Sequence, residues 1–172
     1  MDSLAKSERL HITIVGRRNV GKSSVISSLI GQEHSIVSEV AGTKTDPVSK
    51  AVDLFPYGPV VLVDTAGIDD EGELSEKRIS KTIRAISNVD FVLVVLDARE
   101  KLSEEEIELL NYLDKVFINY IVVVNKIEFG VNQELLSALK ELNETHYEVS
   151  CKEHIGFETL KRNIIRKLPV SN

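Results

Sequence analysis

One stretch of the chain has the residue types and spacing of a phosphate-binding loop. The apolar residues 12–15 lead into Gly16-Arg17-Arg18-Asn19-Val20-Gly21-Lys22-Ser23, and a helical pattern follows. Two glycines let the backbone wrap closely around an anion, and N–H groups at the start of a helix point toward it. Lys22 is expected to reach the β- and γ-phosphates, and the Ser23 hydroxyl to hold Mg²⁺. A glycine-rich turn without a ligand is the alternative, and the flanking strand and helix argue against it.

A second group, Asp64-Thr65-Ala66-Gly67, comes directly after the apolar residues 60–63. Asp64 is predicted to hold Mg²⁺, directly or through water, and the N–H of Gly67 to meet the γ-phosphate. An isolated Asp before a turn more often caps that turn. The phosphate-binding loop upstream favours the metal-binding interpretation here.

The residues Asn125-Lys126-Ile127-Glu128 follow another apolar run and indicate recognition of a base. The Glu128 carboxylate can accept hydrogen bonds from N1–H and the exocyclic amino group of guanine, whereas adenine presents an acceptor at N1. Lys126 is predicted to lie along the base, and Asn125 to brace the loops. Ser150-Cys151-Lys152, after the last predicted strand, would supply backbone N–H groups near the guanine oxygen. The predicted ligands are therefore GTP and GDP.

The elements that must position these groups alternate between strands and helices. Apolar runs predict strands at residues 12–15, 48–54, 60–63, 91–96, 120–124 and 146–149, with a turn at 57–59. Helical periodicity predicts helices over residues 24–30, 79–86, 103–113, 132–142 and 157–168, with Gly31 ending the first. Residues 32–47 and 68–73 are predicted as loops. The alternation indicates an α/β fold with a six-stranded, mostly parallel sheet, one antiparallel strand and five flanking helices. Ligands then bind beyond the carboxyl ends of the strands.

Length and composition indicate one domain. The 172 residues are 42% hydrophobic, carry a formal charge of −6 and contain one cysteine. We expect a GTP-binding domain at residues 10–169, a tail at 1–9, and the start of a linker at 170–172. Without a membrane-length apolar run or a secretory signal, a cytoplasmic location is expected. The negative charge argues against a nucleic acid partner. Cys151 is interpreted as a packing residue, because no partnered base is evident.

Together these groups resemble, in order and over nearly the whole chain, the five signatures of the Ras-like P-loop GTPases. Asn19, the segment 42–46 and Ile68 are similar to the TrmE/Era branch of that family. Shorter segments, at residues 45–48, 58–60, 69–74 and 81–82, resemble the GTPase domain of HydF, a maturation protein of FeFe-hydrogenase. The HydF resemblance implies a slow GTP-hydrolysing switch that regulates docking of radical-SAM maturases. It also implies that two such domains can pair.

The resemblance implies nucleotide contacts at particular residues. They are Arg18, Asn19, Val20, Gly21, Lys22, Ser23, Ser24, Thr43, Thr45, Asp64, Gly67, Asn125, Lys126, Glu128, Ser150, Cys151 and Lys152. Mg²⁺ ligands are implied at Ser23, Thr43, Thr45 and Asp64, and catalytic roles at Asn19, Lys22 and Gly67. Asn19 would also help bind K⁺ at the place where an arginine finger otherwise acts. Equal GTP turnover in KCl and NaCl would exclude this role of K⁺.

Three residues depart from familiar patterns. Lys44 stands where the branch usually has a threonine on Mg²⁺, so Thr43 or Thr45 substitutes, Lys44 itself meets the γ-phosphate, or Mg²⁺ is held more weakly. Glu128 replaces an aspartate, which keeps the charge but adds a methylene group. Ile68 replaces the glutamine that orients water in Ras-type proteins, so slow hydrolysis is expected.

Two alternatives to a role in hydrogenase maturation stay open. One is a TrmE/Era-like GTPase in tRNA modification or ribosome assembly. The other is a nucleotide-gated binding module with negligible hydrolysis. The iron–sulfur and dimerisation regions of HydF proteins are not found in these 172 residues, so an isolated domain is expected.

Overall fold

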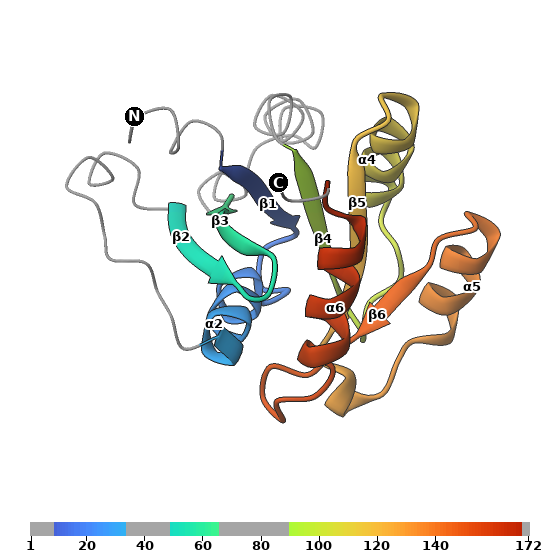
Figure 1. Cartoon of the computed structure of the whole chain (residues 1–172). Coiled ribbons are helices and arrows are strands. Elements are labelled where there is room, and N and C mark those ends of the chain that lie inside the picture. The colour runs from blue at the N-terminus through green and yellow to red at the C-terminus, as the bar shows by residue number, and fades with distance from the viewer. Residues whose placement is uncertain (1–8, 34–48, 66–89, 170–172) are drawn as a thin grey trace.

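A six-stranded sheet forms the centre of the computed structural model, which describes residues 9–33, 49–65 and 90–169 (Figure 1). Its strands are β1 (Leu10–Gly16), β2 (Ser49–Leu54), β3 (Gly58–Asp64), β4 (Phe91–Asp97), β5 (Asn119–Asn125) and β6 (His146–Glu148). The strand order is β2-β3-β1-β4-β5-β6, and among these described strands β2 and β3 alone pair in antiparallel fashion. The predicted sheet is therefore confirmed.

Helices cover both faces of the sheet (Figure 1). The described residues form α2 (Lys22–Glu33), α4 (Glu104–Lys115), α5 (Gln133–Glu141), α6 (Phe157–Lys167) and the short 3₁₀ helix η3 (Ile127–Phe129). Side chains of α2 and α6 share one core cluster, and side chains of α4 and α5 share the other. In β4, Leu93 and Val95 face the first cluster while Val92 and Val94 face the second. All seven residues of β4 are buried, as expected for a parallel strand covered on both sides.

Side-chain caps fix where two of the helices begin. The Ser103 hydroxyl accepts from the backbone N–H of Glu106, and the Glu106 carboxylate accepts from the backbone N–H of Ser103, which completes a capping box at α4. Asn132 accepts from two backbone N–H groups at the start of α5. Both predicted caps are confirmed.

Several predicted boundaries differ from the structure by one to three residues, and two of these differences have a clear cause. Helix α2 does not stop at Gly31 but continues to Glu33, because Gly31 keeps a helical backbone and does not take the positive φ of a glycine that ends a helix. The turn between β2 and β3 spans residues 55–57 rather than 57–59, since the N–H of Tyr57 bonds to the carbonyl of Leu54 and Gly58 already pairs with Leu54. The predicted helix at 79–86, most of the loop at 32–47 and the loop at 68–73 lie outside the described residues. Within the described part of the chain, no helix has the length and apolar character needed to cross a membrane.

Among the glycines that the structure describes, Gly156 is a position where an added methyl group is expected to cost much stability. Gly156 precedes α6 with φ of +88°, and a Cβ there would collide with the carbonyl oxygen of Glu148 and lie 3.0 Å from Cγ1 of Val149. Gly156→Ala is expected to lower the free energy of unfolding by about 3 kcal/mol, from backbone strain and overpacking. Urea denaturation measures this change. Gly31→Ala is the matched control, expected to raise stability by about 0.5–1 kcal/mol. Equal effects of both substitutions would contradict the argument.

Candidate functional site

The predicted site residues that the structure describes gather at one edge of the sheet. Because β1, β3, β4, β5 and β6 run parallel, their carboxyl ends meet there. A cavity of about 450 Å³ opens at this edge. It is lined by Gly21, Ser23, Ser24, Ser27, Ser28, Asn125, Lys126, Glu128, Cys151 and Lys152. The cavity therefore brings together residues from the phosphate-binding loop, the Asn125–Glu128 group and the segment after β6.

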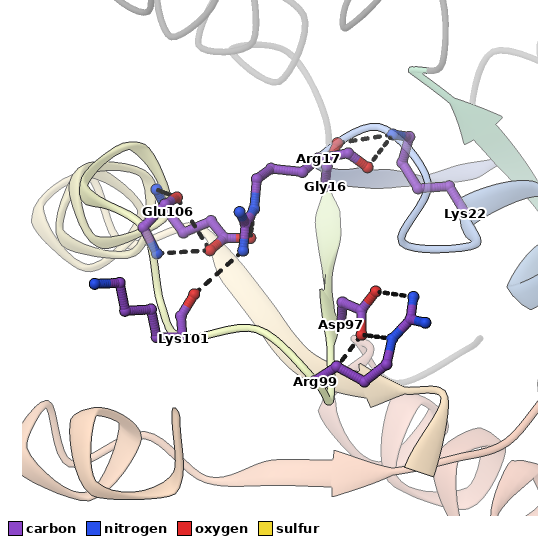
Figure 2. A network of polar contacts seen from close by, with 8 residues as sticks. Gly16, Arg17, Lys22, Asp97, Arg99, Lys101 and Glu106 are labelled. Atoms are coloured by element: carbon purple, nitrogen blue, oxygen red, sulfur yellow. Dashed lines mark hydrogen bonds and ion pairs between the residues drawn. The ribbon is translucent and has the colours of Figure 1, made fainter. Parts of the chain in front are cut away.

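The Lys22 side chain folds back onto the phosphate-binding loop and bonds to its carbonyl groups. Lys22 is only 6% exposed, and its Nζ donates to the carbonyl oxygens of Gly16 at 2.7 Å and Arg17 at 3.1 Å (Figure 2). Asn19 and Gly21 both have positive φ, of 70° and 97°. These conformations let the chain reverse between β1 and the start of α2. Lys22 thus carries a buried positive charge at the start of a helix, where an anion is favoured.

Ser23 and Asp64 supply oxygen atoms beside this loop. The Ser23 hydroxyl donates to Oδ2 of Asp64 at 3.0 Å. The parallel register of β1 and β3, which pairs Ile14 with Asp64, brings the carboxylate to the end of β1. Hydroxyl and carboxylate oxygens are ligands that suit Mg²⁺. The two residues predicted to hold Mg²⁺ therefore lie next to each other, and their role as ligands stays a prediction.

Asn125 connects the phosphate-binding loop to the segment that follows β6. It is 2% exposed, and its Nδ2 donates to the carbonyl of Val20 at 3.0 Å while its Oδ1 accepts from the N–H of Cys151 at 3.3 Å. The contact requires a glycine at position 21, because a Cβ there would lie 2.5 Å from Nδ2 of Asn125. The predicted bracing role of Asn125 agrees with these contacts.

Lys126 contacts both the phosphate-binding loop and Asp97. The Lys126 Nζ donates to the carbonyl of Asn19 at 2.5 Å and lies 3.7 Å from Oδ2 of Asp97. Burial would raise the pKa of Asp97, but hydrogen bonds and charge from Arg99, with help from Lys126, lower it below its ordinary value. The Arg99 guanidinium in turn lies 4.8 Å from the Phe129 ring centre. Asp97 was missed in the sequence, although a carboxylate that ends a buried strand marks this same edge of the sheet.

Glu128 is oriented by a buried hydroxyl. The Ser150 Oγ donates to Oε1 of Glu128 at 2.6 Å and accepts from the N–H of Glu153 at 2.9 Å. This hydrogen bond is the main reason that the pKa of Glu128 lies below its ordinary value. Ser150 was predicted to act through its backbone N–H alone, so its side-chain role is new. Burial raises the pKa of the Cys151 thiol, which agrees with a packing residue rather than a nucleophile.

Some predicted residues are not part of this description. Thr43, Lys44, Thr45, Gly67 and Ile68 lie outside the described residues. Arg18 is exposed on the loop, and Lys152 is exposed at the rim of the cavity.

Comparison with known proteins identifies the family. Residues 11–126 match the model of a family described as 50S ribosome-binding GTPases. The chain belongs to this family. It is a GTP-binding domain of the TrmE/Era type that hydrolyses GTP, and this GTPase domain uses Mg²⁺ with its nucleotide.

Curated relatives of this GTPase domain include tRNA modification GTPases named MnmE. The MnmE of Clostridioides difficile (strain 630) is 37% identical over 160 residues, which are 91% of this chain and 34% of that protein. The MnmE of Aquifex aeolicus (strain VF5) is 33% identical over 162 residues, which are 94% of this chain and 35% of that protein. The chain thus spans about a third of the length of these relatives.

A solved structure of Era in complex with MgGDPNP and nucleotides of 16S ribosomal RNA has the same fold. It aligns with a TM-score of 0.69 and 26% identity, over 94% of this chain and 57% of that chain. The predicted P-loop GTPase fold is confirmed by this likeness.

Proposed function

We propose that this GTPase domain serves in tRNA modification, within a longer protein of the MnmE type. The observation that carries the proposal is the identity of 33% and 37% with two MnmE proteins, over 94% and 91% of this chain. The aligned length is long enough to include both the phosphate-binding loop and the segments around Glu128 and Ser150. Of the functions considered from the sequence, the tRNA modification alternative is better supported than hydrogenase maturation.

We assign the phosphate end of a guanine nucleotide to the loop around Lys22. Lys22 and the backbone N–H groups of residues 19–24 hold the phosphates, and the buried position of the Lys22 Nζ supports this assignment. Ser23 and Asp64 hold Mg²⁺, which bridges phosphate oxygens and neutralises charge during hydrolysis. From the sequence alone we add Thr43, Thr45 and Gly67 to this end.

We assign the base end to the opposite side of the cavity. Glu128 accepts from the guanine edge, and the hydrogen bond from Ser150 that orients its carboxylate supports this role. Lys126 lies along the base, and Asn125 holds the surrounding loops, in part by accepting from the Cys151 N–H. From the sequence alone we add the backbone N–H of Lys152, and that of Cys151 once it exchanges Asn125 for the base. An acceptor pair facing two guanine donors would exclude adenine.

The proposal makes RNA a substrate of the longer protein, contrary to the expectation drawn from charge. The formal charge of −6 favours an RNA contact made outside this domain. The HydF assignment, radical-SAM partners, pairing of two domains and a role of Asn19 in K⁺ binding remain predictions. None of the relatives described above is a HydF protein.

Deleting the gene in its own organism and measuring three products separates the candidate functions. A role in tRNA modification predicts loss of particular modified nucleosides from bulk tRNA, measured by mass spectrometry after nuclease digestion. Ribosome assembly predicts a deficit of a ribosomal subunit in sucrose gradients, and hydrogenase maturation predicts loss of FeFe-hydrogenase activity. Reintroduction of the intact gene is the control. Unchanged tRNA nucleosides would contradict the proposal.

A further inference from the structure

Arg17 connects the phosphate-binding loop to the N-terminus of α4. Its Nε donates to Oε2 of Glu106 at 3.1 Å, and its Nη2 donates to the carbonyl of Lys101 at 3.2 Å. Figure 2 shows the guanidinium directed toward Glu106 and Lys101, while Lys22 lies on the other side of the Arg17 backbone. The side chain of Arg17 therefore points to a helix and not to the cavity.

Glu106 is a fixed partner for this arginine. The residue is 4% exposed, and its Oε1 accepts from the backbone N–H of Ser103 at 2.9 Å and from the Ser103 hydroxyl at 3.1 Å. The capping box holds one carboxylate oxygen and aims the other at Arg17. A buried carboxylate needs a positive partner close by, because an uncompensated buried charge is strongly destabilising.

The backbone of Arg17 holds the other end of the connection. Its carbonyl oxygen accepts from Nζ of Lys22 at 3.1 Å and from the N–H of Val20 at 3.4 Å. The same residue thus contacts α4 through its side chain and Lys22 through its backbone. A shift of the Arg17 backbone would change where the Lys22 ammonium is held.

We propose that Arg17 is a positioning residue for nucleotide binding: Glu106 anchors its guanidinium, and the anchored backbone holds Lys22 where the phosphates bind. The proposal rests on the assignment of Lys22 to the phosphates under the proposed function. It differs from a direct contact between Arg17 and a phosphate, which would need the guanidinium on the cavity side. It also makes the start of α4 a place from which nucleotide affinity can be changed.

The variants Glu106→Gln, Arg17→Ala and their combination test the proposal in the whole chain. Glutamine is compatible with a capping box, so Glu106→Gln keeps the helix start but removes the charge that holds Arg17. Each single variant is expected to weaken binding of a fluorescent GDP analogue by about 5- to 10-fold, as for loss of a partly exposed charged hydrogen bond. The affinity of the combined variant for the GDP analogue should be no lower than that of the single variant with the lower affinity, because both substitutions remove the same connection. Arg17→Lys should restore part of the affinity.

The matched control is Leu109→Val, which loosens the buried face of the same helix and leaves both Arg17 and Glu106 unchanged. It should lower the temperature of unfolding while GDP affinity stays within about 2-fold of wild type. If Glu106→Gln changes affinity no more than this control, or if the two single effects multiply in the combined variant, Arg17 does not position Lys22. Unchanged or tighter binding by Glu106→Gln together with a loss in Arg17→Ala would instead show direct contact with phosphate. These outcomes leave the proposed function intact, whereas GDP binding by a chain that lacks the Lys22 ammonium would overturn the phosphate assignment itself.

Discussion

Lys22→Ala is expected to weaken GDP and GTP binding by at least about 100-fold, which corresponds to about 2.7 kcal/mol of binding free energy. The Lys22 ammonium is nearly buried, and its two described carbonyl partners aim it along the loop that faces the cavity. A charged donor in such a position makes a strong hydrogen bond to phosphate. Replacement by alanine removes this donor and leaves the negative charge of the phosphate uncompensated. Titration of a fluorescent GDP analogue in Mg²⁺ buffer measures the loss.

Lys50→Ala is the control for removal of a positive charge. Lys50 lies exposed on β2, and its loss should leave nucleotide affinity within about 2-fold. Circular dichroism should confirm that both variants keep the fold. If Lys22→Ala binds GDP as the wild type does, the phosphate-binding loop has been assigned wrongly.

The sequence predicts those parts of the site that depend on strand ends. Asp64 and Asn125 each end a strand made of apolar residues, and parallel strands bring their carboxyl ends to one edge. The rule also brings Asp64, at the end of β3, beside the loop that follows β1, and Ser23 lies at the end of that loop. Local patterns also predict the helix starts at Ser103 and Asn132, because a cap involves residues only a few positions apart.

Contacts between side chains far apart in the chain could not be predicted in this way. Arg17 and Glu106 are 89 positions apart, and their meeting depends on β1 and β4 being neighbours in the sheet. Glu106 is also fully explained by its capping role when only the sequence is considered. The contact of Lys126 with Asn19 spans 107 positions and depends on the left-handed conformation of both residues. Strand order and backbone conformation, rather than residue type, decide these contacts.

The two ends of the cavity are connected by backbone contacts of the phosphate-binding loop. Asn125 bonds to the carbonyl of Val20 and Lys126 to that of Asn19, so both residues of the base end hold the loop that faces the phosphates. Under the proposed assignment, a base that contacts Lys126 would therefore also fix the loop. The hydrogen bond from Asn125 to Val20 brings the Asn125 side chain close to Gly21. A Cβ at position 21 would collide with it, so a glycine is needed there.

Glu128→Gln is expected to weaken GDP binding by about 30- to 100-fold, as for loss of a hydrogen bond to a charged group, and to raise the relative affinity for xanthosine diphosphate. The wild-type carboxylate presents only acceptors to the two donors of guanine, while a glutamine amide faces one of them with an N–H₂ group. Xanthine carries an oxygen in place of the exocyclic amino group, and the amide can donate to it. Competition of GDP, inosine diphosphate and xanthosine diphosphate against a fluorescent GDP analogue measures the ranking.

Glu128→Asp is the matched control, because it keeps the charge and removes one methylene group. Its shorter side chain loses the 2.6 Å contact with Ser150 unless the loop moves, so GDP affinity should change by less than about 10-fold and the preference for guanine should persist. The ranking of affinity for the three nucleotides must therefore depend on the charge of the side chain at position 128 and not on the length of that side chain. If Glu128→Gln keeps the wild-type order, the base is recognised by other groups that line the cavity, such as Lys126 or Lys152.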